Sequence, residues 1–167
     1  MRLWDWALEV HARPGVGVAC LTLQDDHGQC VSLLLWRAWT VAEARPVASP
    51  LLEAAIADAR VWEGQVTAPL RSARRAMKTL TIVDDAQRVA LRARVQAAEL
   101  DAERLLLEAL EARTPAATDA REDLAAALEA AATAWNGKAG VVGPLVEALG
   151  SSPSPRGRRK GPAKLGG

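Results

Sequence analysis

Apolar residues recur at every third or fourth position along most of this chain, and no segment shows the strict alternation of a half-buried strand. This periodicity predicts amphipathic helices, which we place over residues 2–12, 14–27, 29–44, 50–77, 84–113, 118–136 and 143–150. The segment 29–44 is apolar on nearly all sides, so it is expected to be the central helix. The predicted fold class is therefore all-α.

Turn and capping residues mark where these helices begin, bend and end. Gly28 is expected to adopt the left-handed conformation that follows a helix end. Asp84 followed by Gln87 resembles a capping box and predicts a new helix start. Gly64 and Pro69 interrupt the long fourth segment, so that helix is expected to bend or break there.

A change in composition near residues 80–84 predicts two folded units. Residues 1–82 are expected to form a compact, Trp-rich helical domain. Residues 83–150 are expected to form a long antiparallel helical hairpin, followed by a short terminal helix. Residues 151–167 contain mainly Pro, Gly, Ser and basic side chains, so we expect a disordered basic tail.

The hairpin prediction depends on two heptad-like apolar stripes that would pair as in a coiled coil. The first stripe contains Leu91, Val95, Ala98, Ala102, Leu105 and Ala109, and the second contains Leu124, Leu128, Ala131 and Trp135. If the stripes pack against each other, they form a core. If one stripe is left over, it becomes a dimer interface or a surface for a protein partner.

The charges are unevenly distributed although the whole chain has a net charge of only +1. Residues 151–167 hold five of the 21 basic residues and no acid, which leaves 16 basic and 20 acidic residues, a net charge of −4, in the first 150 residues. A body with this charge is not that of a typical nucleic-acid-binding domain.

Cysteine content and hydropathy favour a cytoplasmic protein with no membrane segment. Two cysteines in 167 residues do not form a disulfide scaffold, and a reducing compartment fits them best. The first ten residues carry three charges and lack the apolar region of a signal peptide. The most apolar run, residues 31–42, is interrupted by Arg37 and is too short to cross a bilayer.

The stretch CLTLQDDHGQC, residues 20–30, places two cysteines, two aspartates and a histidine close together in sequence. On a helix, Cys20 and His27 share a face but lie about 10 Å apart along the axis. Zinc ligands lie about 2.0–2.3 Å from the metal, so these two side chains are poorly placed to share one ion. We therefore expect no metal site and no cofactor here.

Asp25 and Asp26 lie at a predicted helix end, where acidic side chains oppose the helix dipole. This placement predicts that one of them has a cationic partner in a buried polar network, with Arg13 or Arg37 as the candidates. A solvated turn is the alternative. No side chain is assigned as catalytic, although His11, Asp25 and His27, with Asp5 and Arg13, would form a general acid–base site if the fold brought them together.

The segment RSARRAMK is the strongest candidate for a binding surface. Arg71, Arg74, Arg75 and Lys78 lie on one helix face with no acid among them. Such a face is most often solvated and paired with acids of the same protein. It could also hold an acidic protein partner, or it could bind nucleic acid together with the basic tail.

Four stretches in the first half of the chain resemble an uncharacterised family of small proteobacterial proteins of about this length. These stretches are LWDWALEVHARPGV, ACLTLQDDHG, VSLLLWRAW and VTAPLRSARRAMK. The resemblance covers about the first 80 residues, and the C-terminal half of the family is variable. It implies a domain of unknown function and a bacterial source, and it transfers no functional residue.

The absence of a recognisable chemical motif, beside well-formed amphipathic surfaces, leads to one main hypothesis. The chain is expected to be a non-enzymatic adaptor or regulatory protein that contacts a protein partner, or a second copy, through helical surfaces. The first alternative is a nucleic-acid-associated accessory protein. The second is a small enzyme with a His/Asp site in residues 5–27.

Overall fold

The computed structural model describes residues 1–151 of the chain, and the predicted basic tail lies outside these residues except for Ser151. Eight α-helices and one π-helix form the described part, without any strand. They are α1 (Leu3–His11), α2 (Val16–Asp25), α3 (Val31–Ala42), α4 (Ser49–Trp62), η1 (Glu63–Thr67), α5 (Ala68–Ala76), α6 (Asp85–Arg113), α7 (Leu124–Asn136) and α8 (Gly143–Gly150). The predicted all-α class is confirmed.

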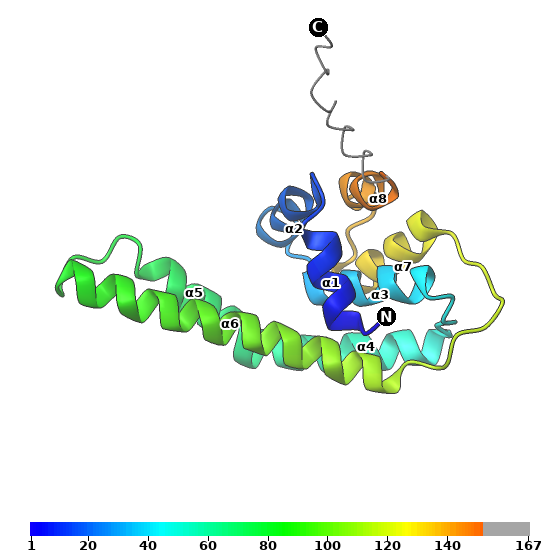
Figure 1. Ribbon diagram of the computed structural model, residues 1–167, viewed down its shortest axis with the longest axis horizontal. Coiled ribbons are helices and arrows are strands. Elements are labelled where there is room, and N and C mark those ends of the chain that lie inside the picture. The colour runs from blue at the N-terminus through cyan, green and yellow to red at the C-terminus, as the bar shows by residue number, and fades with distance from the viewer. Residues whose placement is uncertain (152–167) are drawn as a thin grey trace, which may run out of the picture.

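Helix α3 forms the centre of the body and contacts α1, α2, α4, α6 and α7 (Figure 1). Trp36 and Trp39, both inaccessible to solvent, fill the space around it. Leu110 of α6 and Leu128 of α7 belong to the same core, so the core draws on both sides of the predicted boundary at 82/83. Whether 1–82 and 83–150 are separate folding units stays a prediction.

Helices α4, η1 and α5 form one nearly continuous rod that runs antiparallel to α6 (Figure 1). The predicted interruption at Gly64 and Pro69 takes the form of the π-helix. Pro69 has no N–H to donate to the carbonyl of residue 65, and the wider π turn accommodates this missing bond. The chain therefore passes from α4 to α5 through the π-helix, with no loop between them.

The predicted hairpin is not formed: residues 84–113 do not pack mainly against residues 118–136. Helix α6 packs on α1, α3, α4, η1 and α5, whereas α7 packs mainly on α3 and also on α4 and α8. Residues 114–123 form an extended connection, and the N–H of Thr118 donates to the carbonyl of Ala44 at 2.8 Å. This connection ties the chain to the end of α3, so that α7 begins at Leu124 rather than at residue 118.

Two local predictions are confirmed. The carboxylate of Asp84 accepts a hydrogen bond from the N–H of Gln87 at 3.1 Å and caps α6. Gly28 has a φ of 65° and turns the chain between α2 and α3.

Beyond the body, α5 and the N-terminal half of α6 extend as a two-helix arm (Figure 1). We define the arm as residues 68–98, within which Arg71 is the one buried residue. Among residues 1–151, no helix combines the length and the apolar character needed to cross a membrane.

Candidate functional site

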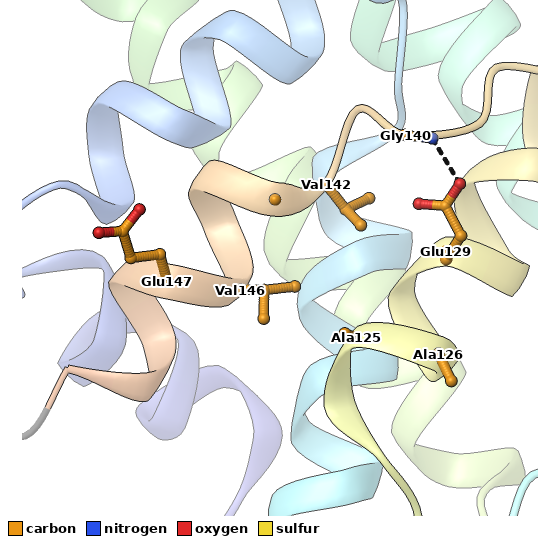
Figure 2. Close-up of a pocket in the computed structure, with 8 residues that line it drawn as sticks. Ala125, Ala126, Glu129, Gly140, Val142, Val146 and Glu147 are labelled. Atoms are coloured by element: carbon orange, nitrogen blue, oxygen red, sulfur yellow. Dashed lines mark hydrogen bonds between the residues drawn. The ribbon is translucent and has the colours of Figure 1, made fainter.

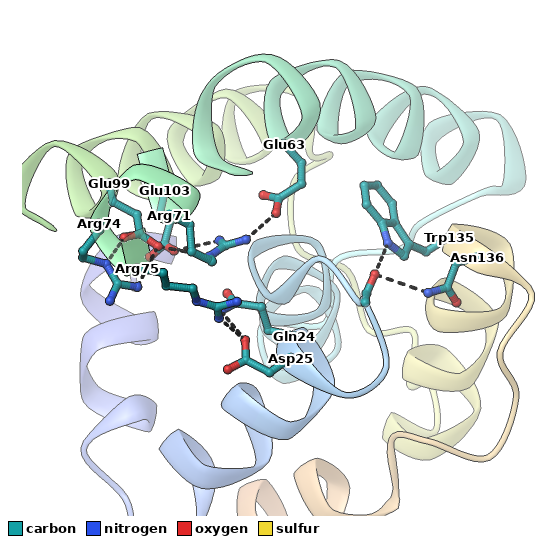
Figure 3. A network of polar contacts seen from close by, with 11 residues as sticks. Gln24, Asp25, Glu63, Arg71, Arg74, Arg75, Glu99, Glu103, Trp135 and Asn136 are labelled. Atoms are coloured by element: carbon teal, nitrogen blue, oxygen red, sulfur yellow. Dashed lines mark hydrogen bonds and ion pairs between the residues drawn. The ribbon is translucent and has the colours of Figure 1, made fainter. Parts of the chain in front are cut away.

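The arm leaves the body at a cluster of charged side chains centred on Arg71 (Figure 3). Arg71 of α5 is 9% exposed, and its guanidinium donates to Glu63 of η1 at 2.6 Å and to Glu99 of α6 at 3.0 Å. A third carboxylate, that of Glu103, lies 3.6 Å from the same guanidinium. Arg71 therefore joins three helical elements where the arm begins.

The other cations of the predicted basic face have different surroundings. Arg74 donates to Glu99, and Arg75 forms an ion pair with Asp25 of α2 (Figure 3). Lys78 is exposed and pairs with no carboxylate of residues 1–151. The structure thus pairs three of the four predicted cations with acids of the same chain. We call Glu63, Arg71, Arg74, Glu99 and Glu103 the root cluster.

Burial and neighbouring charges shift the pKa values of Glu103 and Arg71 in the root cluster. Burial raises the pKa of Glu103, and the charges of Glu99 and Glu63 raise it further, whereas the nearby Arg71 lowers it. Burial lowers the pKa of Arg71, but the hydrogen bond and charge of Glu63, with the charges of Glu99 and Glu103, outweigh burial and raise it. Arg71 remains cationic, and Glu103 is the carboxylate that the cluster accommodates least well.

Replacing Glu103 with glutamine is expected to stabilise the protein at neutral pH. A carboxyl whose pKa is raised in the folded state binds its proton more tightly there, so its contribution to stability falls as pH rises above the ordinary value of 4.5. The neutral amide removes this cost while keeping the side-chain shape. Urea unfolding should show the gain at pH 7 and little difference below pH 4. A loss of stability at pH 7 would contradict the assignment, and Glu53→Gln on the exposed side of α4 serves as the control.

The predicted network of Asp25 and Asp26 with Arg13 or Arg37 is not formed. Asp25 does have a cationic partner, but it is Arg75, fifty residues away in sequence. Arg13 pairs instead with Glu9, one helical turn before it. Arg37 is buried and donates to Glu122 and to Thr40. Asp26 is exposed and forms no ion pair among residues 1–151.

The ion-pair partners of Asp25 and Arg37 are determined by which neighbouring element each side chain faces. Hydrogen bonds from Gln24 and Arg75 lower the pKa of Asp25, although burial opposes this shift. Arg37 lies on the side of α3 that faces the 114–123 connection, where it donates to Glu122. Neither arrangement can be read from sequence spacing.

The turn after α2 is held by the end of α7, which sequence analysis did not anticipate. The indole N–H of Trp135 and the amide of Asn136 donate to the carbonyl of Gly28 at 2.9 Å and 3.3 Å (Figure 3). The Asn136 amide also donates to the carbonyl of His27 at 2.9 Å. Gln29 is 3% exposed and donates to the Asn136 side chain at 2.9 Å. Residues 27–29 of CLTLQDDHGQC therefore join the turn between α2 and α3 to the end of α7.

The apolar stripe predicted for α6 lies largely on the surface. Leu91 is 45% exposed and Leu105 is 48% exposed. The buried positions of α6 are Glu99, Ala102, Leu106, Leu107 and Leu110, so the stripe and the buried face share Ala102 alone. The burial direction is rotated because α6 packs on α1, α3, α4, η1 and α5 rather than on the predicted partner α7. We define the outer face of α6 as Leu91, Val95, Ala98, Leu105 and Ala109.

A family model described as a protein of unknown function, DUF2390, matches residues 2–110. The chain belongs to this family. The DUF2390 match contains α1 to α5 and nearly all of α6, and thus the whole root cluster and the whole outer face of α6. It extends well beyond the first 80 residues on which the resemblance was based, and the bacterial source stays a prediction. No curated protein and no solved structure matches the chain.

Within the DUF2390 region, the residues of the enzyme hypothesis are not brought together. The Nε2 of His11 lies 3.5 Å from the position that a Cβ on Gly17 would occupy, at the start of α2. Asp25 is at the other end of α2, about 12 Å further along its axis. Among residues 1–151, no three or more His, Cys, Asp or Glu side chains are placed to hold a metal ion.

The two thiols are poor nucleophiles in this setting. Burial raises the pKa of Cys20 to about 11 and that of Cys30 to about 12, so both are protonated at neutral pH.

A depression between α7 and α8, outside the DUF2390 match, has a volume of about 530 Å³ (Figure 2). Its walls are mostly apolar and include Ala126, Val142 and Val146. Glu129 at its rim accepts a hydrogen bond from the N–H of Gly140, and Glu147 is the second carboxylate. Its lining contains no histidine, cysteine, lysine or hydroxyl group, so it offers no nucleophile or base beyond these carboxylates.

Proposed function

We propose that this DUF2390 protein is a non-enzymatic helical interaction protein, an adaptor or regulator that holds another polypeptide along its arm. The observation that supports this best is the outer face of α6, an exposed apolar stripe that begins on the arm and continues along α6 beside the body. Exposed apolar side chains gathered along one helix face cost free energy in water, and covering them with a partner recovers it.

The spacing of the outer face indicates the shape of the occupant. Leu91, Ala98 and Leu105 follow one another at intervals of seven residues, and Val95 and Ala109 lie four residues after the first and the last of these. Such a pattern fits an α-helix lying lengthwise, because a second helix presents its own side chains at the same repeat. The small side chain of Ala98 at the middle allows the two backbones to approach closely.

The root cluster would give the arm a defined direction. A projection made of two helices with little burial of its own would otherwise bend at the π-helix. Charge-assisted hydrogen bonds from Arg71 to both η1 and α6 restrain that joint, which reduces the ordering cost when a partner binds.

The nucleic-acid alternative receives less support. Its candidate residues Arg71, Arg74 and Arg75 already pair with carboxylates, and a phosphate would have to displace these acids. Lys78 alone among the four has no acid beside it within residues 1–151. The proposal therefore keeps the protein-interaction hypothesis, together with the predicted cytoplasmic location.

Site-specific photo-crosslinking in the native cell tests the proposed function. A benzophenone amino acid at position 91 or 105 is expected to give polypeptide adducts, whereas the same residue at position 21 is not. Leu21 is a matched control, because it is 59% exposed but lies on α2 in the body. The adducts should disappear when Ala98→Glu places a charge in the middle of the outer face. Absence of adducts from both outer-face positions, or equal yields from position 21, would contradict the proposal.

A further inference from the structure

We infer that the occupant of the outer face of α6 is a second copy of this chain, lying antiparallel to the first. The inference rests on the proposed function and names the partner. Three features support it: the charge distribution along α6, the size pattern of its outer face, and a groove at its base that matches its tip.

Charge changes sign along α6. Residues 85–97 contain three arginines and one acid, whereas residues 98–113 contain five acids and two arginines. A parallel copy would place like charges side by side, whereas an antiparallel copy places the basic half of one helix on the acidic half of the other. The helix is therefore complementary to itself only in the antiparallel orientation.

Two charged side chains border the outer face on the side away from α5. Arg94 and Asp101 are seven residues apart, and both are exposed. Neither forms an ion pair within residues 1–151, although Glu99 and Glu103 beside them are engaged by Arg71. When the twofold axis passes between Val95 and Ala98, Arg94 faces Asp101 of the second copy, and symmetry produces this pair twice.

The same register matches large side chains with small ones. Val95 then lies against Ala98 of the second copy, and symmetry produces this contact twice. Alternation of branched or long side chains with alanine lets two helices interdigitate at close range. Shifting the axis by half a heptad would instead oppose Asp101 to Asp101, so the charges select one register.

The base of the arm offers a place for the tip. A groove of about 300 Å³ lies between α4 and α6, lined by apolar Val61, Leu105 and Ala109 and closed by the ion pair of Asp58 and Arg113. At the tip, the turn before α6 exposes Leu80, Ile82 and Val83 by 44–85%. In the inferred register, residues 82 and 83 of one copy lie opposite residues 110–111 of the other, beside this groove.

The contact is modest in size. The overlap of residues 84–109 is about 39 Å long and one helix wide. This places the interface at the low end of specific protein–protein contacts, so the dimer should depend on concentration in the micromolar range.

Sedimentation of the purified full-length chain over about 1–200 µM tests the inference. The wild type is expected to shift from monomer to dimer with rising concentration. Arg94→Asp alone and Asp101→Arg alone should each weaken the dimer at least about tenfold, because each introduces two like-charge contacts. Mixing the two variants should restore the dimer, since every pair in the mixed species again joins opposite charges. Arg104→Asp, on the opposite side of α6, should leave dimerisation unchanged.

The possible outcomes separate this inference from the proposed function. A chain that remains monomeric to 200 µM, or a mixture that fails to restore association, would overturn the antiparallel dimer. Circular dichroism should show equal folding of all variants, because both residues are exposed. If the chain is monomeric yet position 91 crosslinks to a different protein in the cell, the proposed function stands and the self-partner does not.

Discussion

Replacing Arg71 with methionine is expected to destabilise the protein by about 3–5 kcal/mol, because it removes the cation that three carboxylates, one buried and two partly buried, share. Glu99 is only 6% exposed, so water cannot replace the hydrogen bond that it loses with Arg71. Glu63 loses its hydrogen bond at 2.6 Å, and Glu99 keeps only Arg74. Urea unfolding followed by circular dichroism at pH 7 measures the loss.

Lowering the pH should reduce the loss of stability caused by Arg71→Met. Burial already raises the pKa of Glu103, and Arg71 is the cation that lowers it, so without Arg71 this carboxylate takes up a proton more readily as pH falls towards 4.5. The difference between wild type and Arg71→Met should therefore be smaller at pH 4.5 than at pH 7. The stability of Arg71→Lys should lie between those of wild type and Arg71→Met. Its single ammonium group cannot reach both η1 and α6, as the forked guanidinium of Arg71 does.

Arg75→Met provides the matched control. It removes a cation from the same helix, but the Arg75 and Asp25 side chains are 46% and 42% exposed. Solvent screens such a pair, so the expected loss is at most about 1 kcal/mol. If Arg71→Met cost no more than Arg75→Met, the basic segment would be an ordinary solvated face and the root cluster would have no structural role.

The helices could be predicted from the sequence, but their neighbours could not. Periodicity shows that a helix has an apolar face, and it located seven segments that correspond to the helices of the structure. It does not show which element covers that face. The alanines of α6 and α7 appeared to match each other, yet α7 covers α3 and the rod of α4 and α5 covers α6.

The candidate site shows the same limit at the level of single residues. The spacing of RSARRAMK predicted four cations on one helix from local geometry, and Arg71, Arg74 and Arg75 do lie on α5, whereas Lys78 follows the end of that helix. Their carboxylates come from η1, α2 and α6, which are distant in sequence, and only tertiary packing places them. An arginine is usually read as exposed, so nothing in the sequence identified Arg71 as buried.

Trp36→Ala is the second substitution with a large expected effect, a loss of about 3–5 kcal/mol. The indole of Trp36 is inaccessible to solvent at the centre of α3, and truncation leaves a cavity that the surrounding helices cannot fill. Its N–H donates to the hydroxyl of Thr114 at 2.8 Å, directly after the end of α6. Trp36→Phe keeps most of the volume and loses this hydrogen bond, so its cost should be smaller, about 1–2 kcal/mol.

The Trp36 variants also test whether the arm and the body unfold together. Helix α6 contributes Leu106, Leu107 and Leu110 to the core around α3, and its N-terminal half forms one side of the arm. If this continuity couples the two parts, Trp36→Ala should lower the midpoints reported by far-ultraviolet circular dichroism and by tryptophan fluorescence equally. All six tryptophans lie outside the arm, so fluorescence reports on the body, whereas circular dichroism also reports on the arm. A second transition seen by circular dichroism alone would mean that the arm unfolds independently, and the fixed direction that we attribute to the root cluster would then be contradicted.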